Sequence, residues 1–198
     1  MKKFWENNIA LAFDVSTRST GWACYIPQTL IASEPLAKLQ PLMYGVIQPP
    51  EQYCYLERIR FLHKVVMGLE PLLFMANKCY IFIEDGVYKH SIKTTMMLGE
   101  ARGAVISACQ EAPAIIEVGV SQWKKSCGCQ LKSVKGEKKG ELEKQMVREN
   151  MCKIWRHDFP QTFIKNKPTY DITDAIGILT HAINTFEFEE VIDKKRKL

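Results

Sequence analysis

Four acidic residues occupy places where a folded chain has little other use for a charge. Asp14 follows the apolar residues IALAF in the segment IALAFDVSTRSTGWACY. Glu84 follows the apolar residues CYIFI in the segment CYIFIEDGVY. Both runs are rich in β-forming residues and predict strands. Asp171 and Asp174 lie three residues apart in YDITDAIGILTHA, which has the apolar spacing of a helix. Two strand acids and two acids one helical turn apart predict a metal cage, because hard divalent cations such as Mg²⁺ prefer carboxylate oxygens.

Each acid also has a plainer interpretation. Asp14 could cap a turn at a strand end, although a buried Asp is normally paired or bound to metal. Glu84 could be a simple turn residue. Asp171 could be an N-cap, and the helix dipole favours acids in a first turn. The apolar helix that follows Asp174 must pack into the core, which favours placing the pair where that core meets the site. His181, on the same face as Asp174, is interpreted as a satisfied core histidine rather than a partner of the site.

Composition limits the class of protein. The chain has 198 residues, 46% of them hydrophobic, and is expected to form a single domain over 1–198 with a disordered basic tail at 193–198. There is no uninterrupted apolar stretch of about 18 residues and no secretory signal pattern, so no membrane partner is expected. Seven cysteines, several in apolar runs, favour a reducing cytoplasm. The pair Cys127 and Cys129 raises a zinc site, but C-x-C without a second pair is not a standard zinc spacing.

Positive charge is concentrated in one segment. Residues 124–156 contain ten Lys and Arg against four Asp and Glu, whereas the rest of the chain has 17 against 18. A basic segment beside an acidic metal site suits a polyanionic substrate such as nucleic acid. The alternative is a solvated helix face with an excess of lysine.

The pattern of apolar and turn-forming residues predicts a mixed α/β layer fold. The polar turn STRST is expected to join the first two strands as a hairpin. Loops are expected over 27–41, which holds three prolines, and over the polar stretch 124–139. Strands are predicted over 9–15, 21–26, 43–47, 79–84 and 114–120, and helices from about 56 to Pro71 and over 94–110, 141–155 and 169–186.

Several motifs resemble one family when they are taken in order. Asp14 lies in AFDVSTRSTGWA and Glu84 in FIEDGVY; LGEARGAVISA, QWKKSCG and KQMV follow, and DITDAIGILTHA supplies Asp171 and Asp174. Over nearly its whole length the chain resembles the RuvC Holliday-junction resolvases of the RNase H-like superfamily. The resemblance implies an α/β, RNase H-like fold with a five-stranded mixed β-sheet flanked by α-helices.

The same resemblance implies a function. It is that of a structure-selective endodeoxyribonuclease that resolves four-way DNA junctions by paired symmetric nicks, acting as a homodimer in the cytoplasm of a bacterium or of a phage-infected host cell. The acids Asp14, Glu84, Asp171 and Asp174 would bind two Mg²⁺ ions, with Mn²⁺ expected to substitute, and Lys124 would join them in catalysis. The implied DNA-binding residues are Tyr88, which would stack on a base, and Arg102, Lys124, Lys125, Lys138 and Lys139.

The chain also departs from the family pattern. Asp14-Val15-Ser16 stands where the family often has Asp-Pro-Gly, and a Ser is tolerated there only if the turn does not need a positive φ. The stretch 27–41 looks expanded, which suggests a divergent, phage-encoded member. Three alternatives stay open: a nuclease for other branched DNA or for RNA–DNA hybrids, a non-cleaving junction-binding module, and a kinase or ATPase of the actin-like superfamily. The last normally has a second Gly-rich phosphate motif, which is not visible.

Overall fold

A single five-stranded sheet runs through the computed structural model, in the order β3-β2-β1-β4-β5. The strands β1 (Asn8–Asp14), β2 (Thr20–Tyr25) and β3 (Leu42–Ile47) form an antiparallel meander, so the predicted hairpin is confirmed. The strands β4 (Lys78–Glu84) and β5 (Ala114–Val118) are parallel to β1. The structure describes residues 3–31, 41–69, 71, 78–86, 91–129, 137–164 and 167–186.

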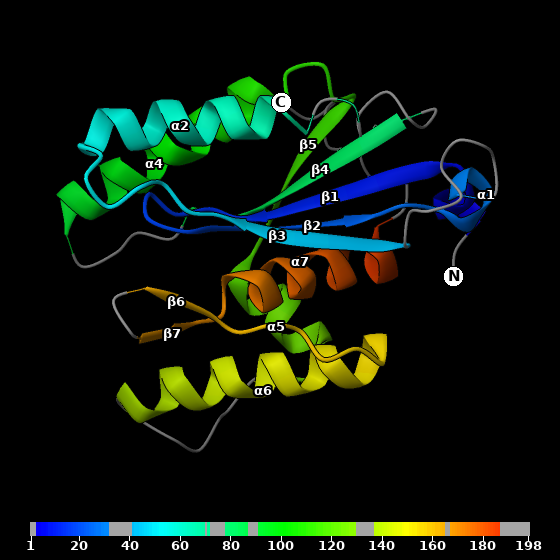
Figure 1. The fold of residues 1–198 in the computed structure, drawn as a ribbon. Coiled ribbons are helices and arrows are strands. Elements are labelled where there is room, and N and C mark those ends of the chain that lie inside the picture. The colour runs from blue at the N-terminus through cyan, green and yellow to red at the C-terminus, as the bar shows by residue number, and fades with distance from the viewer. Residues whose placement is uncertain are drawn as a thin grey trace.

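Helices cover both faces of this sheet (Figure 1). The helices α2 (Tyr55–Met67) and α4 (Ile92–Ala108) lie on one face. The helices α5 (Val120–Ser126), α6 (Glu137–Trp155) and α7 (Asp171–Thr185) lie on the other. The predicted α/β class with a five-stranded mixed sheet is confirmed. The remaining elements are η1 (Lys3–Glu6), α1 (Gln28–Ile31), β6 (Thr162–Ile164) and β7 (Lys167–Thr169).

The two faces follow from the alternation of side chains along the central strand β1. Ile9, Leu11 and Phe13 belong to the core beneath α2 and α4, whereas Ala10 and Ala12 belong to the core beneath α7. The small side chains lie on the α7 side, where they leave room for a helix that is itself buried along most of its length. The apolar run in the sequence is therefore continuous because both faces of β1 are covered.

Four details differ from the prediction. The helix α2 ends at Met67 rather than near Pro71, because Gly68 follows it and caps it with an N–H bond to the Lys64 carbonyl of 3.2 Å. The predicted loop 124–139 includes the end of α5 and the start of α6, and the predicted loop 27–41 includes α1. The two-stranded ribbon of β6 and β7 was not predicted, since three-residue strands carry too little periodicity. The tail 193–198 lies outside the described residues.

The helix α7 lies directly on the strands β1 and β2. Gly21 of β2 pairs with Asp14 of β1. A Cβ atom at position 21 would overlap the backbone carbonyl of Asp171, the first residue of α7. At Gly21 the helix and the strand pair therefore approach backbone to backbone, which lets the helix acids lie close above the sheet.

We expect Gly21→Ala to destabilise the fold by about 3 kcal/mol or more, because backbone rather than a flexible side chain must move. Chemical denaturation monitored by circular dichroism measures the change. Gly140→Ala is the matched control: a Cβ there meets nothing within 4 Å in helix α6, so this variant should gain up to about 1 kcal/mol. Equal stability of Gly21→Ala and the wild type would contradict the close approach.

Candidate metal centre

The two strand acids lie next to each other at the carboxyl edge of the sheet. The strands β1 and β4 are neighbours and are paired up to the residue before each acid. Ala12 and Phe82 belong to the core on the α7 side. Asp14 and Glu84 follow by two residues each, so their side chains also face α7.

The two helix acids come down onto the same edge. Tyr170 is the N-cap residue of α7 and Asp171 is its first helical residue, so the alternative of Asp171 as an N-cap does not hold. The Asp171 carboxylate instead accepts the hydroxyl proton of Ser19, 152 residues away in the turn between β1 and β2. The N–H of Asp174 donates to the Tyr170 carbonyl at 2.8 Å, which places Asp174 in the first turn.

The turn that presents Ser19 is tied together by its own side chains. The Ser16 hydroxyl donates to the Ser19 carbonyl at 2.8 Å, and the Thr20 hydroxyl donates to the Ser16 carbonyl at 2.7 Å. Among the described residues other than glycine, only Arg156 has a positive φ, so Ser16 adopts an ordinary conformation. Ser16 can therefore stand where the family often has a glycine, because the turn does not need a positive φ at this position.

The four acids share one electrostatic field. Burial raises the pKa of Asp14 well above its ordinary value, and the charges of Asp174, Glu84 and Asp171 raise it further. Burial also raises the pKa of Asp174 from 3.8 to about 7. The structure thus brings together the four acids that the sequence singled out, in a place that resists their negative charge.

The site contains a buried oxygen that lacks a partner. In the part of the chain that the structure describes, Oδ1 of Asp174 is buried and accepts no hydrogen bond. Within the same part, no group of three or more His, Cys, Asp or Glu side chains is arranged so that it could hold a metal ion in the present conformation, so binding would require the carboxylates to turn towards one another. The donors are carboxylate oxygens alone, and their field favours added positive charge. The donor type and the charge fit a hard divalent cation such as Mg²⁺ better than a soft metal.

Trp123 is a residue of the site that the sequence analysis did not single out. It is the one buried side chain of the short helix α5, and its indole N–H donates to Oε2 of Glu84 at 3.0 Å. Its ring packs on Gly177 of α7, where a Cβ atom would lie 2.7 Å from the ring. Trp123 therefore joins the strand acid to the helix that carries the other acids. In the sequence, the signal that could have identified Trp123 was a large aromatic residue next to two lysines in an otherwise polar stretch.

Two lysines lie close to the acids. Lys124 forms an ion pair with Glu143 at 3.6 Å, and its charge lowers the pKa of Asp174. Lys144 of α6 lowers the pKa of both Asp14 and Asp174. Lys124 was predicted at the site, but Lys144 was not, because a helical residue 27 positions before Asp171 has no local pattern that links it to an acid.

The other predicted DNA-binding residues are distributed around this centre. Lys125 is exposed at the end of α5. Arg102 of α4 forms an ion pair with Glu117 of β5, and its guanidinium packs under Gly86 in the turn after β4. Its role in DNA binding stays a prediction. Tyr88 lies outside the described residues, and so do the side chains of Lys138 and Lys139, which begin helix α6.

His181 and the cysteine pair have ordinary structural partners. Nδ1 of His181 lies 2.8 Å from the Ser126 hydroxyl, and burial lowers the pKa of the imidazole. The Cys127 thiol donates to the Gly177 carbonyl at 3.5 Å and the Cys129 thiol to the Cys127 carbonyl at 3.1 Å. Burial raises the pKa of both thiols, which disfavours the thiolate that zinc needs. The structure therefore gives no support to a zinc site.

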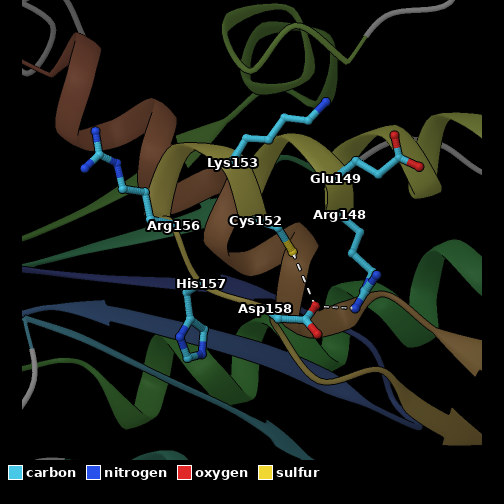
Figure 2. A pocket seen from close by; sticks show the side chains of 7 residues that line it. All are labelled: Arg148, Glu149, Cys152, Lys153, Arg156, His157 and Asp158. Atoms are coloured by element: carbon cyan, nitrogen blue, oxygen red, sulfur yellow. Dashed lines mark hydrogen bonds and ion pairs between the residues drawn. The ribbon is translucent and has the colours of Figure 1, made fainter.

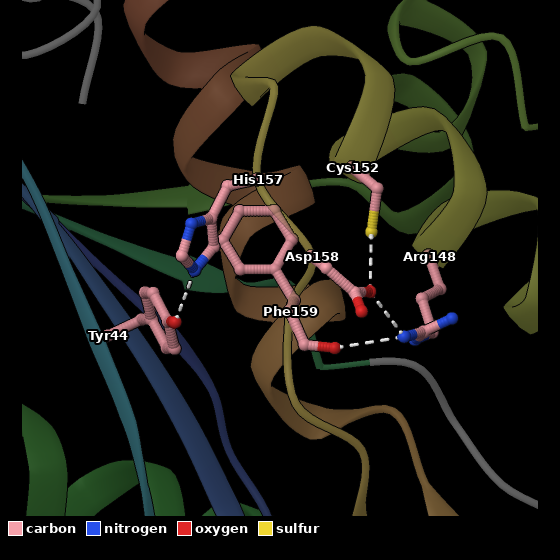
Figure 3. A network of polar contacts seen from close by, with 6 residues as sticks. All are labelled: Tyr44, Arg148, Cys152, His157, Asp158 and Phe159. Atoms are coloured by element: carbon pink, nitrogen blue, oxygen red, sulfur yellow. Dashed lines mark hydrogen bonds and ion pairs between the residues drawn. The ribbon is translucent and has the colours of Figure 1, made fainter.

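A separate open pocket of about 460 Å³ lies at the carboxyl end of α6 (Figure 2). Its cations Lys153 and Arg156 point away from each other, so they do not converge on one ligand. A polar network closes this end of the helix, with an Arg148–Asp158 ion pair of 2.7 Å and a Tyr44–His157 hydrogen bond of 2.7 Å (Figure 3). The pocket is lined by Arg148, Glu149, Cys152, Lys153, Arg156, His157 and Asp158.

Comparison with known proteins supports one fold. No family model matches the chain. The crossover junction endodeoxyribonuclease RuvC of Dictyoglomus thermophilum is 26% identical over 103 residues, which are 52% of this chain and 59% of that protein. The match thus spans about three-fifths of the relative's length. The solved structure of Thermus thermophilus RuvC superposes with a TM-score of 0.59 at 18% identity, over 88% of this chain and 93% of that one.

A second solved structure, of T. thermophilus RuvC in complex with Holliday junction substrate, gives a TM-score of 0.61 at 16% identity, over 88% of this chain and 92% of that one. The chain has a RuvC-like fold. The RNase H-like architecture and the family resemblance predicted from the motifs are confirmed. Within the described residues, no helix is long and apolar enough to cross a membrane.

The crowding of carboxylates predicts how stability of this RuvC-like chain changes with pH. The raised pKa of Asp174 means that its protonated form is favoured in the folded state. The associated stability is present below pH about 4 and is lost as the pH rises towards 7. In EDTA, the advantage of Asp174→Asn over the wild type should therefore be small at pH 4.5 and grow with pH, reaching at least about 1 kcal/mol, or about 2–4 °C in Tm, at pH 8.

Differential scanning calorimetry between pH 4.5 and 8 measures this difference. Asp158→Asn is the control, since that carboxylate is exposed and paired with Arg148, and its variant should gain nothing at pH 8. An Asp174→Asn protein that is less stable than the wild type at pH 8 would show that the acids do not repel one another.

Proposed function

We propose that this chain is a Mg²⁺-dependent, structure-selective endodeoxyribonuclease that resolves four-way DNA junctions by paired symmetric nicks. The observation that carries the proposal is the acid cluster itself: two strand acids and two helix acids lie at one edge of a RuvC-like sheet, the pKa of Asp14 and that of Asp174 are raised, and a buried oxygen of Asp174 has no hydrogen-bond partner among the described residues. The similarity to RuvC proteins supports the substrate class. We treat residues 1–198 as a single nuclease domain.

Asp14, Glu84, Asp171 and Asp174 would hold two Mg²⁺ ions, or Mn²⁺ in their place. Bound divalent cations make water more acidic and neutralise the charge on the attacking and leaving oxygens of a phosphodiester. The chain's own residues then have positional roles. Ser19 orients the Asp171 carboxylate, and Trp123 orients Glu84 through its indole N–H.

Lys124 would bind the DNA backbone at the site. Its Nζ is held by Glu143 at 3.6 Å, and its field reaches Asp174. A lysine ammonium beside the acids supplies a point charge for a phosphate oxygen that the carboxylates would otherwise repel. Lys125, Lys138, Lys139 and Arg102 would extend the contact to flanking phosphates, and Tyr88 would stack on a base where the strands open.

A homodimer would suit the two-fold symmetry of a four-way junction. Several large apolar side chains are exposed on the helices α2 and α4, on the face of the sheet opposite the acids. The two helices contact each other. We propose this exposed apolar face as the dimer surface. Its exposed members are Leu56, Met67, Ile92, Met96 and Ile106.

The remaining alternatives are a nuclease for other branched DNA or hybrids and a module that binds junctions without cutting. The presence of all four acids favours cleavage over binding alone. The described residues contain one five-stranded sheet, which favours a nuclease over an actin-like kinase, whose architecture duplicates the domain. All seven cysteines are free thiols, which fits the proposed cytoplasmic location.

We expect the purified protein to nick a synthetic four-way junction symmetrically in Mg²⁺, and to leave the matching linear duplex intact. Asp14→Asn and Glu84→Gln should lower the cleavage rate at least about 10³-fold yet retain junction binding, because the acids would hold metal rather than DNA. Denaturing gels measure cleavage, and gel shifts in EDTA measure binding. Efficient cleavage by Asp14→Asn would remove the acids from the mechanism; cutting of flaps or hybrids instead would change the substrate.

We expect Tyr88→Ala to reduce junction cleavage about 10-fold or more, since a lost stacking contact costs about 1–3 kcal/mol. Tyr88→Phe keeps the ring and should retain activity. Single-turnover rates on one junction compare the two variants. An unchanged rate for Tyr88→Ala would remove this aromatic from the site.

A further inference from the structure

Helix α6 directs two consecutive side chains of opposite charge towards the acids. Glu143 pairs with Lys124 of α5. Lys144 points to the start of α7, where its Nζ lies 5.9 Å from the centre of the Tyr170 ring. The helices α6 and α7 pack against each other, so this contact joins two neighbouring elements of the α7 side of the sheet.

Tyr170 places this ammonium beside the metal centre. It directly precedes Asp171, and its carbonyl accepts the N–H of Asp174 at 2.8 Å. A cation over an aromatic face is held by the ring's electrons and keeps its remaining surface open to other ligands. The ring therefore fixes where the Lys144 charge lies without neutralising it.

Lys144 has a positive charge that no carboxylate holds. The side chain is exposed, and in the described ranges no Asp or Glu oxygen forms an ion pair with it, in contrast to Lys124. Its field nevertheless reaches Asp14 of β1 as well as Asp174 of α7. The Lys144 ammonium lies beside the acids and no carboxylate of the described residues occupies its N–H groups. It is therefore suited to bind an anionic oxygen of a ligand that approaches the same acids.

We propose that Lys144, held in place by the ring of Tyr170, binds a non-bridging oxygen of the scissile phosphate and is the second cationic side chain of the reaction beside Lys124. This inference rests on the proposed phosphodiester hydrolysis. Tyr170 is a positioning residue in this arrangement. Lys138 and Lys139, which the resemblance implies as DNA-binding residues, lie at the start of α6, about 7–9 Å further along the helix axis.

Lys144 would speed the reaction because negative charge on the phosphoryl oxygens increases in the transition state. Two lysines on different helices can bind two oxygens of one phosphate and hold it in line with the attacking water. Because Lys144 is a cation, it should oppose rather than assist the binding of Mg²⁺. This opposite sign separates a contact with the phosphate from support of the metal ligands.

The test compares Lys144→Met with Lys144→Arg and with the control Lys153→Met. Lys153 is on the same helix, about 13 Å further along its axis, and loses the same charge. Single-turnover cleavage of a four-way junction is measured across a Mg²⁺ titration. Junction affinity is measured in EDTA, and Tm in EDTA at pH 8 reports whether the charge lies beside the acids.

For Lys144→Met we expect a rate about 10²-fold lower at saturating Mg²⁺, a Mg²⁺ midpoint that is unchanged or lower, and a lower Tm in EDTA at pH 8. Lys144→Arg should recover much of the rate. Lys153→Met should keep the rate within about twofold and show at most a small loss of affinity from the reduced overall charge. Tyr170→Leu should lower the rate less than Lys144→Met, and the double variant should resemble Lys144→Met alone.

Two results would overturn the proposal while leaving the proposed function intact. One is wild-type cleavage by Lys144→Met. The other is a Mg²⁺ midpoint raised several-fold with full rate at high Mg²⁺, which would assign Lys144 to the metal ligands. If the wild-type protein cuts no branched DNA under any of these conditions, the proposed function fails first and the role of Lys144 fails with it.

Discussion

The packing of α7 directly onto β1 and β2 determines where every acid of the centre lies. The strands place Asp14 and Glu84 at one edge of the sheet, and the helix places Asp171 and Asp174 over that edge. This arrangement depends on backbone approaching backbone at Gly21, where even a methyl group has no room. A helix raised by one side-chain diameter would separate the helix acids from the strand acids.

That packing forces like charges together, and neighbouring residues limit the cost. Ser19 and Trp123 donate hydrogen bonds to Asp171 and Glu84, from the β1–β2 turn and from α5. Burial and mutual repulsion still raise the pKa of Asp14 and Asp174. The proposed cations would relieve this repulsion, as expected where function requires groups that folding alone would not bring together.

The positive charges around the centre come from helices that are distant in the sequence. Lys124 belongs to α5, whereas Lys144 belongs to α6 and rests on the ring of Tyr170. The sequence pointed to a basic segment but could not say which of its lysines face the acids, because rotation of a helix by one residue redirects a side chain by about 100°. Only the packing of α6 against α7 decides this rotation.

The sequence by itself determined the class of the fold and the identity of the four acids. Alternating apolar runs, a polar turn after Asp14 and the spacing of Asp171 and Asp174 are local patterns, and local patterns reflect the periods of strands and helices. The tertiary structure alone decided the partners of those acids. Ser19 with Asp171, Trp123 with Glu84 and Lys144 with the ring of Tyr170 are contacts between segments far apart in the chain, and no periodicity encodes them. Such contacts depend on the position and rotation of each helix on the sheet. The packing of the complete apolar face of the helix against the sheet decides both.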